Sequence, residues 1–327
     1  MSDNLNSFVG LDLKPVQSPN QPLPKIAVCL AAFNGGEWLR EQLDSILVQK
    51  NVVVTVFVSV DQSNDGTELW VNEFSKIDKR VIQLPQGFRF GGAAANFFRL
   101  LNDVDFAAFD YVSLADQDDI WYPDKLWRAV MLLSESGFDC YSSNVLAFWE
   151  DGTERLIDKA QSQREWDFLF EAAGPGCTYV FKRVVVENIK KLLVSHPSEV
   201  TKVGLHDWFI YAFARTAGYR WLIDPLPSMA YRQHSANQVG VNAGWKAYRV
   251  RAAKIFSGWG ISQARLIARL LEVDNESFCL PWRQHGRLGM LWLAMNAYRV
   301  RRKFSDRFIF AMVCLLLALL GDRSDDQ

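Results

Sequence analysis

Several features that define common protein classes are missing from this chain of 327 residues. Its five cysteines are scattered and form no CxxC pair, which argues against a disulfide framework and against a zinc site. The formal net charge of −1 gives no argument for nucleic-acid binding by the whole chain. The first residues lack the charged and apolar regions of a signal peptide, so we expect a cytoplasmic protein. The Gly-Gly pairs at 35–36 and 91–92 are not the GxGxxG pattern of a dinucleotide fold.

What the sequence does contain is a regular alternation of short apolar runs with helical patterns. Four runs are typical of buried strands, and apolar residues at helical spacing follow each of them. The runs are Lys25–Ala31, Val52–Val60, Arg80–Leu84 and Tyr111–Ala115. The alternation predicts an α/β domain with a Rossmann-like, mostly parallel sheet flanked by helices.

Composition divides the chain into three predicted parts. Residues 1–24 are polar, carry four prolines and are predicted to be a disordered leader. Residues 25–240 hold the predicted α/β domain, which continues through further strand patterns at Phe138, Ala172 and Trp221. Residues 241–327 are rich in Lys and Arg with interleaved tryptophans, and we expect a basic helical extension with an apolar tail.

The most informative stretch follows the run Tyr111–Ala115, where Asp116, Asp118 and Asp119 lie within four residues. Crowded carboxylates repel one another unless a cation, an arginine or water compensates them. Hard oxygen ligands of this kind suit Mg²⁺ or Mn²⁺, which commonly use one or two carboxylates together with substrate phosphate. Open α/β sheets also bind their ligands at the carboxyl ends of strands. The alternative is the solvated start of a helix, where aspartate is common; Asp119 is a candidate cap.

Four signals occur in a fixed order along the chain. They are Phe33-Asn34-Gly35, the stretch from Asp61 to Thr67, Asp116-Gln117-Asp118-Asp119, and His206-Asp207-Trp208 followed by His234. In this order they resemble the family 2 glycosyltransferases with the GT-A fold. The details Ala-Asp-Gln-Asp-Asp-Ile-Trp, Gly-Cys-Thr and Tyr-Arg-Gln-His look like the rhamnosyltransferase-like branch of that family. The resemblance covers roughly residues 25–240.

The resemblance implies a role for each matching residue. The nucleotide-sugar donor would lie against Ala32, Phe33, Asn34, Asp61, Asn96, Asp116 and Gln117. Asp118 and His234 would hold Mg²⁺ or Mn²⁺, and Asp207 would be the catalytic base. Three alternatives remain open at this point: turn chemistry for Asp61, a helix N-cap for Asp207, and a purely structural histidine at position 234.

The implied activity is that of an inverting, metal-dependent hexosyltransferase. It would transfer a sugar, expected to be rhamnose from dTDP-rhamnose, to a glycan or lipid-linked acceptor in the synthesis of a surface polysaccharide. The first alternative is the same fold with another donor such as a UDP-hexose. The second is a non-catalytic module that binds glycan or serves as a scaffold.

The apolar run Phe308–Leu320 is too short for an ordinary transmembrane helix of about twenty residues. Because Arg299, Arg301, Arg302, Lys303 and Arg307 precede it, it suits an interfacial helix on anionic lipid. We therefore expect peripheral contact with the inner face of the plasma membrane. The alternative is a helix of the core or of a dimer interface.

Overall fold

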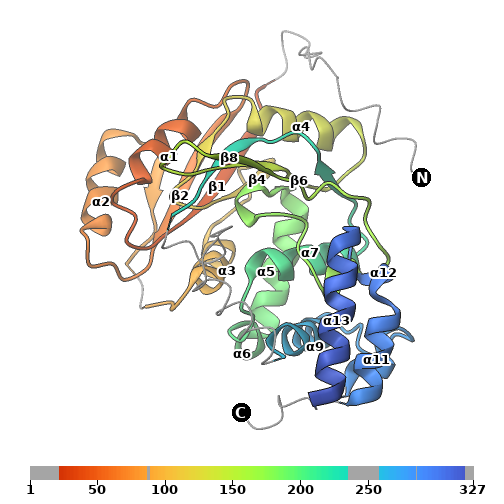
Figure 1. The fold of residues 1–327 in the computed structure, drawn as a ribbon. Coiled ribbons are helices and arrows are strands. Elements are labelled where there is room, and N and C mark those ends of the chain that lie inside the picture. The colour runs from red at the N-terminus through yellow and green to blue at the C-terminus, as the bar shows by residue number, and fades with distance from the viewer. Residues whose placement is uncertain (1–21, 87–88, 235–257, 285, 321–327) are drawn as a thin grey trace. The chain divides into compact units, whose positions relative to one another are not determined.

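The computed structural model describes residues 22–86, 89–234, 258–284 and 286–320 (Figure 1). Contacts divide the chain into two compact units. The first consists of Met1–Ala160, Gly174–Ser195 and Gly218–His234, and the second of Gln161–Ala173, His196–Ala217 and Ser235–Gln327. Most of the predicted leader and the predicted boundary at residue 240 lie outside the described residues, so both stay predictions.

The first unit is built on a seven-stranded sheet. Its strands are β1 (Lys25–Ala32), β2 (Val53–Val60), β3 (Val81–Gln83), β4 (Tyr111–Ala115), β6 (Cys140–Ser143), β9 (Val180–Lys182) and β10 (Trp221–Asp224). The order is β10-β6-β9-β4-β1-β2-β3, and only β9 among them runs antiparallel to its neighbours, β4 and β6. The predicted strands are confirmed, and so is the mostly parallel sheet.

Helices cover both faces of this sheet. They are α1 (Leu39–Leu47), α2 (Thr67–Ile77), α3 (Ala93–Asp103), α4 (Lys125–Glu135) and α5 (Arg183–Ser195). Alternate residues of β1, such as Ile26 and Val28, join one apolar core with Leu43 of α1 and Leu126 of α4. Helices α3 and α5 lie on the other face (Figure 1). Burial of the sheet on both faces explains why its strands read as continuous apolar runs.

A second, four-stranded sheet was not predicted from the sequence. Its strands, in the order β5-β11-β7-β8, are β5 (Ile120–Trp121), β11 (Met229–Arg232), β7 (Val145–Phe148) and β8 (Glu154–Ile157). Strand β11 pairs antiparallel with β5, directly after the acidic stretch. This pairing places His234, which follows β11, near the residues that follow β4.

The second unit is helical, as predicted for the C-terminal extension. It contains the short 3₁₀ helix η1 (Asp167–Leu169) and the helices α6 (Pro197–Val200), α7 (His206–Thr216), α9 (Trp259–Leu270), α10 (Leu280–Arg283), α11 (Arg287–Met295), α12 (Ala297–Val300) and α13 (Phe304–Leu320). Arg302 belongs to the basic run on which the predicted lipid contact rests, but its own side chain is not available for that contact. Arg302 is 2% exposed because its guanidinium forms ion pairs with Asp167 and Glu171 of the same unit.

A buried ion pair fixes α4 to β10 in the first unit. Asp224 is 1% exposed and accepts hydrogen bonds from Arg128 Nε at 2.5 Å and from the Tyr141 hydroxyl at 3.0 Å. Loss of one partner of a buried pair leaves the other charge uncompensated, which commonly costs about 3–5 kcal/mol.

We therefore expect Asp224→Asn to lower the free energy of unfolding by several kcal/mol, measured by chemical denaturation. The matched control is Asp78→Asn, which alters a solvent-exposed pair with Arg80 and is expected to cost less than about 1 kcal/mol. Equal effects of the two substitutions would contradict the structural importance of the buried pair.

Candidate active site

Three parallel strands, β1, β2 and β4, end at the same edge of the sheet, and their loops meet there. The register pairs Leu30 with Ala115, so the residues after each strand run side by side. The Gln117 side chain joins the two loops: its Oε1 accepts the Phe33 N–H at 2.8 Å, and its Nε2 donates to the Phe33 carbonyl at 2.9 Å. A Cβ on Gly35 would come within 2.2 Å of Gln117 Oε1, so this contact requires glycine.

The loops after β1 and β2 are tied by a second set of bonds. Asn34, whose φ of 47° lies in the left-handed region, accepts the Asn64 N–H at 2.9 Å, and its own N–H donates to Ser63 Oγ at 3.0 Å. The Gly36 N–H donates to Asp65 Oδ2 at 3.0 Å. Phe33 remains 46% exposed. The strand ends thus form a braced surface on which an aromatic side chain faces outward.

Asp61 and Asn96 both lie buried at the end of β2. The Asp61 carboxylate accepts the N–H groups of Phe90 and Gly91 at 2.8 and 3.1 Å, which holds the start of α3 against the strand end. Asn96 Nδ2 donates to the Ser59 carbonyl at 3.0 Å and to the Ala32 carbonyl at 3.4 Å. In this structure both side chains brace the site from beneath.

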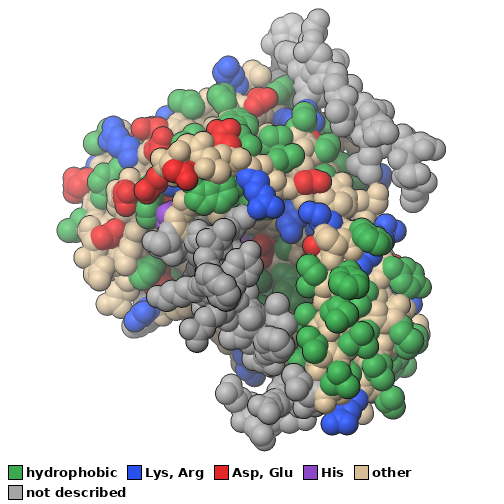
Figure 2. All heavy atoms as spheres, viewed as in Figure 1, with side chains coloured by type: hydrophobic (Ala, Val, Ile, Leu, Met, Phe, Trp, Pro, Cys, Tyr) green, Lys and Arg blue, Asp and Glu red, His purple; other side chains and the backbone are tan. Residues whose placement is uncertain are grey.

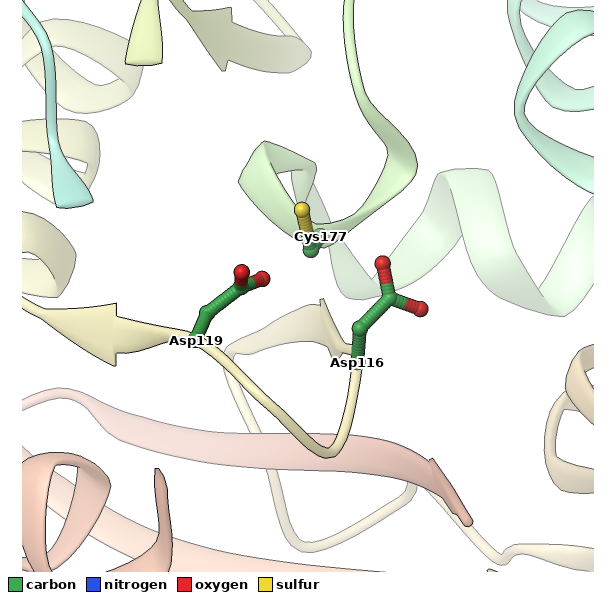
Figure 3. Close-up of side chains that lie close together, drawn as sticks. All are labelled: Asp116, Asp119 and Cys177. Carbon is green, nitrogen blue, oxygen red and sulfur yellow. The ribbon is translucent and has the colours of Figure 1, made fainter. Parts of the chain in front are cut away.

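The acidic loop after β4 brings Asp116 and Asp119 close to Cys177 of the 3₁₀ turn η2 (Gly176–Thr178). One ligand atom of each residue lies within 4.8 Å of the others, and Figure 3 shows the three side chains directed at a common space. Burial and repulsion from Asp118 and Asp116 raise the pKa of Asp119 well above its usual range. Asp119 is fully buried and accepts the Arg232 N–H at 3.2 Å. It is therefore part of the site floor, and the expectation that it caps the next helix is wrong.

Lys125, the first residue of α4, supplies positive charge beneath this loop. Its side chain is fully buried, its Nζ donates to the Cys177 carbonyl at 2.7 Å, and it lies 3.1 Å from the centre of the Trp121 ring. Burial lowers the Lys125 pKa to about 7, although the neighbouring Asp119 and Asp116 favour its charged form. Burial also raises the pKa of the Cys177 thiol well above its usual range, with Asp119 adding to the shift. A buried thiol with a raised pKa, next to the Lys125 amine, does not fit Mg²⁺ or Mn²⁺, which prefer hard oxygen ligands.

The side chain of Asp118 contacts His234. Asp118 Oδ2 lies 2.7 Å from His234 Nε2, and the two side chains are 13% and 8% exposed. The His234 ring stacks on Trp38 with centroids 4.0 Å apart. Arg232 Nε donates to the Asp118 carbonyl at 2.8 Å and its guanidinium pairs with Glu41. A carboxylate oxygen and an imidazole nitrogen this close together form a donor set that suits Mn²⁺.

The second unit carries the remaining sequence-predicted residue. Asp207 is the second residue of α7, and its Oδ1 accepts the Trp208 N–H at 2.8 Å. The N-cap position belongs to Leu205, so Asp207 lies inside the first turn. His206 beside it is 9% exposed, and burial lowers its pKa to about 3. A neutral imidazole and a carboxylate thus open α7.

The mostly parallel α/β sheet with carboxylates at its strand ends agrees with the GT-A fold, and the comparisons identify the class as that of the glycosyltransferases. Residues 27–179 match the sequence model of glycosyl transferase family 2. The chain is 43% identical over 289 residues to the dTDP-rhamnosyl transferase RfbG of Shigella flexneri, an alignment that covers 88% of this chain and 99% of that protein. The chain therefore belongs to glycosyl transferase family 2, and it is an enzyme of that class.

More distant relatives share the fold or part of the sequence. The UDP-Glc:alpha-D-GlcNAc-diphosphoundecaprenol beta-1,3-glucosyltransferase WfgD of Escherichia coli is 23% identical over 49% of this chain and 61% of its own. Among solved structures, the mannosyltransferase PcManGT from Pyrobaculum calidifontis, in complex with GDP-Man and Mn²⁺, has a TM-score of 0.50. That match, at 19% identity, covers 94% of this chain and 89% of the mannosyltransferase. TarS 1–349 of S. aureus also has a TM-score of 0.50, at 15% identity over 90% of this chain and 80% of the TarS chain.

Sequence reasoning missed several residues that shape this site, namely Lys125, Trp38, Glu41 and Arg232. Lys125 carried a usable signal, because it is a charged residue at the start of a helix whose next residues, Leu126 and Trp127, are apolar. Trp38 contacts His234 and Glu41 contacts Arg232, and each pair is almost two hundred positions apart in the sequence. No local sequence pattern indicates contacts over such a separation.

The depressed pKa of His206 predicts acid sensitivity. The unfolded chain binds a proton near pH 6.5 and the folded chain near pH 3, so His206 contributes stability above pH 6.5 that is lost as the pH falls toward 3. We expect a loss of about 2–3 kcal/mol from this residue between pH 6 and pH 4.

The measurement is the free energy of unfolding at several pH values for the wild type and for His206→Gln, which removes the titrating group. The variant should have a flatter acid limb. His196→Gln, in the same unit, is the control and should keep the wild-type slope. A His206→Gln profile parallel to the wild type would contradict the prediction.

Proposed function

We propose that this chain is an inverting, metal-dependent rhamnosyltransferase that uses dTDP-rhamnose and acts on a glycan or lipid-linked acceptor in polysaccharide synthesis. The observation that supports the donor most strongly is the 43% identity to a dTDP-rhamnosyl transferase over nearly the whole of both chains. The strand-end site supplies residues of the types that bind a nucleoside diphosphate.

The donor would bind across the strand ends of the first unit. Phe33 offers an exposed ring beside the clamped backbone of Ala32 to Asn34, where a nucleotide base can stack. Asp116 would accept a ribose hydroxyl, while Gln117 keeps the loop in place. For Asp61 to contact the base, its bonds to the N–H groups of Phe90 and Gly91 would have to be exchanged. Asn96 would not contact the donor directly; it would keep the Ala32 backbone in place through its hydrogen bond to the Ala32 carbonyl.

Asp118 and His234 would hold a divalent cation, which stabilises the negative charge that develops on the departing diphosphate. Trp38 fixes the plane of the His234 ring by stacking, and Arg232 fixes the Asp118 backbone. Glu41 in turn orients Arg232. The donor atoms are thus held by neighbours before any ligand arrives, which reduces the entropy lost on binding.

Asp207 would remove the proton of the acceptor hydroxyl as its oxygen attacks the anomeric carbon. The sugar carbon then changes configuration because the diphosphate leaves from the opposite side. Burial lowers the pKa of His206 to about 3, so it does not pair with Asp207 as a cation, and its ring is too weak a base to take the acceptor proton readily. This leaves the Asp207 carboxylate as the acid–base group of the helix start.

A second candidate is the same reaction with a UDP-hexose, because the relative from Escherichia coli is named for UDP-Glc. Its lower identity and shorter coverage make this the weaker proposal. The test is a transfer and thermal-shift screen of dTDP-rhamnose against UDP-hexoses, with and without Mn²⁺, since a ligand bound only to the native state raises the melting temperature.

Peripheral membrane contact is a further part of the proposal. No helix among the described residues combines the length and the apolar character needed to cross a bilayer. Helices α11 and α13 nevertheless present a group of exposed apolar side chains (Figure 2). These are Leu288, Leu291, Met295, Phe304, Phe308, Ile309, Met312, Leu315, Leu316 and Leu319. Lys303 and Arg287 are exposed at the ends of these helices and can attract anionic headgroups.

The metal prediction concerns Asp118. We expect Asp118→Asn to keep the fold and to weaken Mn²⁺-dependent binding of dTDP by more than about tenfold, because a charged oxygen ligand is replaced by a neutral one. Isothermal calorimetry with and without Mn²⁺ measures the effect. Asp110→Asn, at the opposite end of the same strand, is the control. An unchanged metal-dependent affinity would remove Asp118 from the metal site.

The base prediction concerns Asp207. Asp207→Asn should lower kcat by roughly 10²–10⁴-fold, the usual contribution of a positioned proton acceptor. The amide oxygen can still accept the Trp208 N–H, so the melting temperature should hardly change. Donor affinity should also stay the same, since the base acts on the acceptor. A near-normal kcat would exclude Asp207 as the base.

The membrane prediction concerns the exposed apolar side chains of α13. Replacing Phe308, Ile309 and Leu319 by Gln should abolish cosedimentation with phosphatidylglycerol vesicles at low salt, where electrostatic attraction is least screened. The control replaces Leu69 and Ile77, exposed apolar residues of α2, and should bind like the wild type. Wild-type protein that stays in the supernatant would contradict the prediction.

A further inference from the structure

A fully buried carboxylate lies at the centre of the second unit. Asp167, at the start of η1, is 0% exposed. It accepts hydrogen bonds from Arg215 at 2.9 Å, from Arg302 at 3.1 Å and from the Tyr211 hydroxyl at 3.1 Å. Three donors from two separate parts of the chain therefore converge on one side chain.

Arg302 extends this network to the backbone that follows η1. Its guanidinium donates to the Ala172 carbonyl at 2.6 Å and pairs with Glu171 at 3.5 Å. Its own N–H donates to the Glu171 carboxylate at 2.6 Å. The two arginines balance the two carboxylates, so the buried cluster, made of Asp167, Glu171, Arg215 and Arg302, has no formal net charge.

Stability alone does not explain such a cluster. Buried ion networks are often no more stabilising than apolar residues of similar volume, because the desolvation of each charge offsets the attraction. What they do provide is direction, since each hydrogen bond fixes an angle as well as a distance. The element whose direction is fixed here is α7.

Tyr211 and Arg215 follow Asp207 by four and eight residues, so the three side chains lie along one side of α7. The neighbouring Trp208 Nε1 donates to the Phe168 carbonyl at 3.0 Å. Helix α7 is thus held by η1 both at its first turn and at the two turns beyond. Its rotation about its own axis would break several of these bonds.

We propose that Asp167 and Arg302 are positioning residues for Asp207: they fix the axial rotation of α7 and thereby the direction of its carboxylate. This inference rests on the proposed role of Asp207 as the base. It makes the segment after α12, which carries Arg302, a part of the catalytic apparatus. A small misplacement of a reacting group lowers the rate strongly, so this constraint bears directly on turnover.

The first experiment measures kcat and the donor KM for Asp167→Asn. We expect kcat to fall roughly 10- to 100-fold with an unchanged donor KM, because the donor loops belong to the first unit. The matched control is Asp224→Asn, which breaks a buried arginine pair of the same kind in the first unit. It should destabilise the protein without lowering kcat, provided that circular dichroism shows both variants folded at the assay temperature.

The second experiment combines Asp167→Asn, and separately Tyr211→Phe, with Asp207→Asn in double variants. If Asp167 acts through Asp207, Asp167→Asn should lower the residual rate of Asp207→Asn hardly at all. Tyr211→Phe removes only the hydroxyl, which donates to Asp167 and accepts from Arg215, and it serves in place of Asp167→Asn if that variant does not fold. It should lower kcat severalfold, and again only when Asp207 is present.

Each outcome decides between the two ideas. A near-normal rate for Asp207→Asn would defeat the proposed base, and the positioning role with it. An impaired Asp207→Asn beside near-normal Asp167→Asn and Tyr211→Phe would defeat the positioning role alone. Multiplicative losses in the double variants, or an equal fall in kcat for Asp224→Asn, would also overturn it.

Discussion

Repulsion among the carboxylates that follow β4 is the constraint on which the first unit depends. Asp119 and Asp116 are compensated by one part of the chain and Asp118 by another. Asp119 and Asp116 face the buried ammonium group of Lys125, whereas Asp118 meets His234. The backbone of Arg232 reaches Asp119, and its side chain reaches the Asp118 carbonyl. The site exists only where the first strand-end loop, the start of α4 and the end of β11 come together.

The three carboxylates therefore lie in two environments. The inner one contains Asp116 and Asp119, and the outer one contains Asp118, which precedes Asp119 directly in the sequence. The inner one includes the fully buried Asp119, the buried amine of Lys125 and a thiol whose pKa burial raises. The outer one is partly exposed and pairs a carboxylate with an imidazole held by Trp38. The oxygen and nitrogen donors of the types that suit a divalent cation therefore belong to the outer environment.

The sequence predicted the sheet well because burial on both faces leaves a local mark. Lys25–Ala31 and Val52–Val60 became β1 and β2 with boundaries within one residue. The ordered motifs also led to the correct family. The second sheet escaped prediction because each of its short strands contains partly or fully exposed residues and so carries no continuous apolar run. The buried position of Arg302 was not predicted, because its partner Asp167 lies 135 positions away in the sequence. A run of basic residues has the same local sequence pattern whether it contacts lipid or pairs with a buried carboxylate.

The antiparallel strand β9 has a consequence for how the chain reaches its fold during synthesis. Strand β9 lies between β4 and β6 in the sheet. Val112 of β4 therefore has no hydrogen-bonding partner on that side until Phe181 of β9 has been synthesised. At ordinary translation rates of about 5–20 residues per second, β4 leaves the ribosome several seconds before that partner. Unpaired strand edges invite aggregation, which places a demand on chaperones during this interval. It also means that residues 27–179, the stretch that matches the family, lack two strands of their own sheet, β9 and β10.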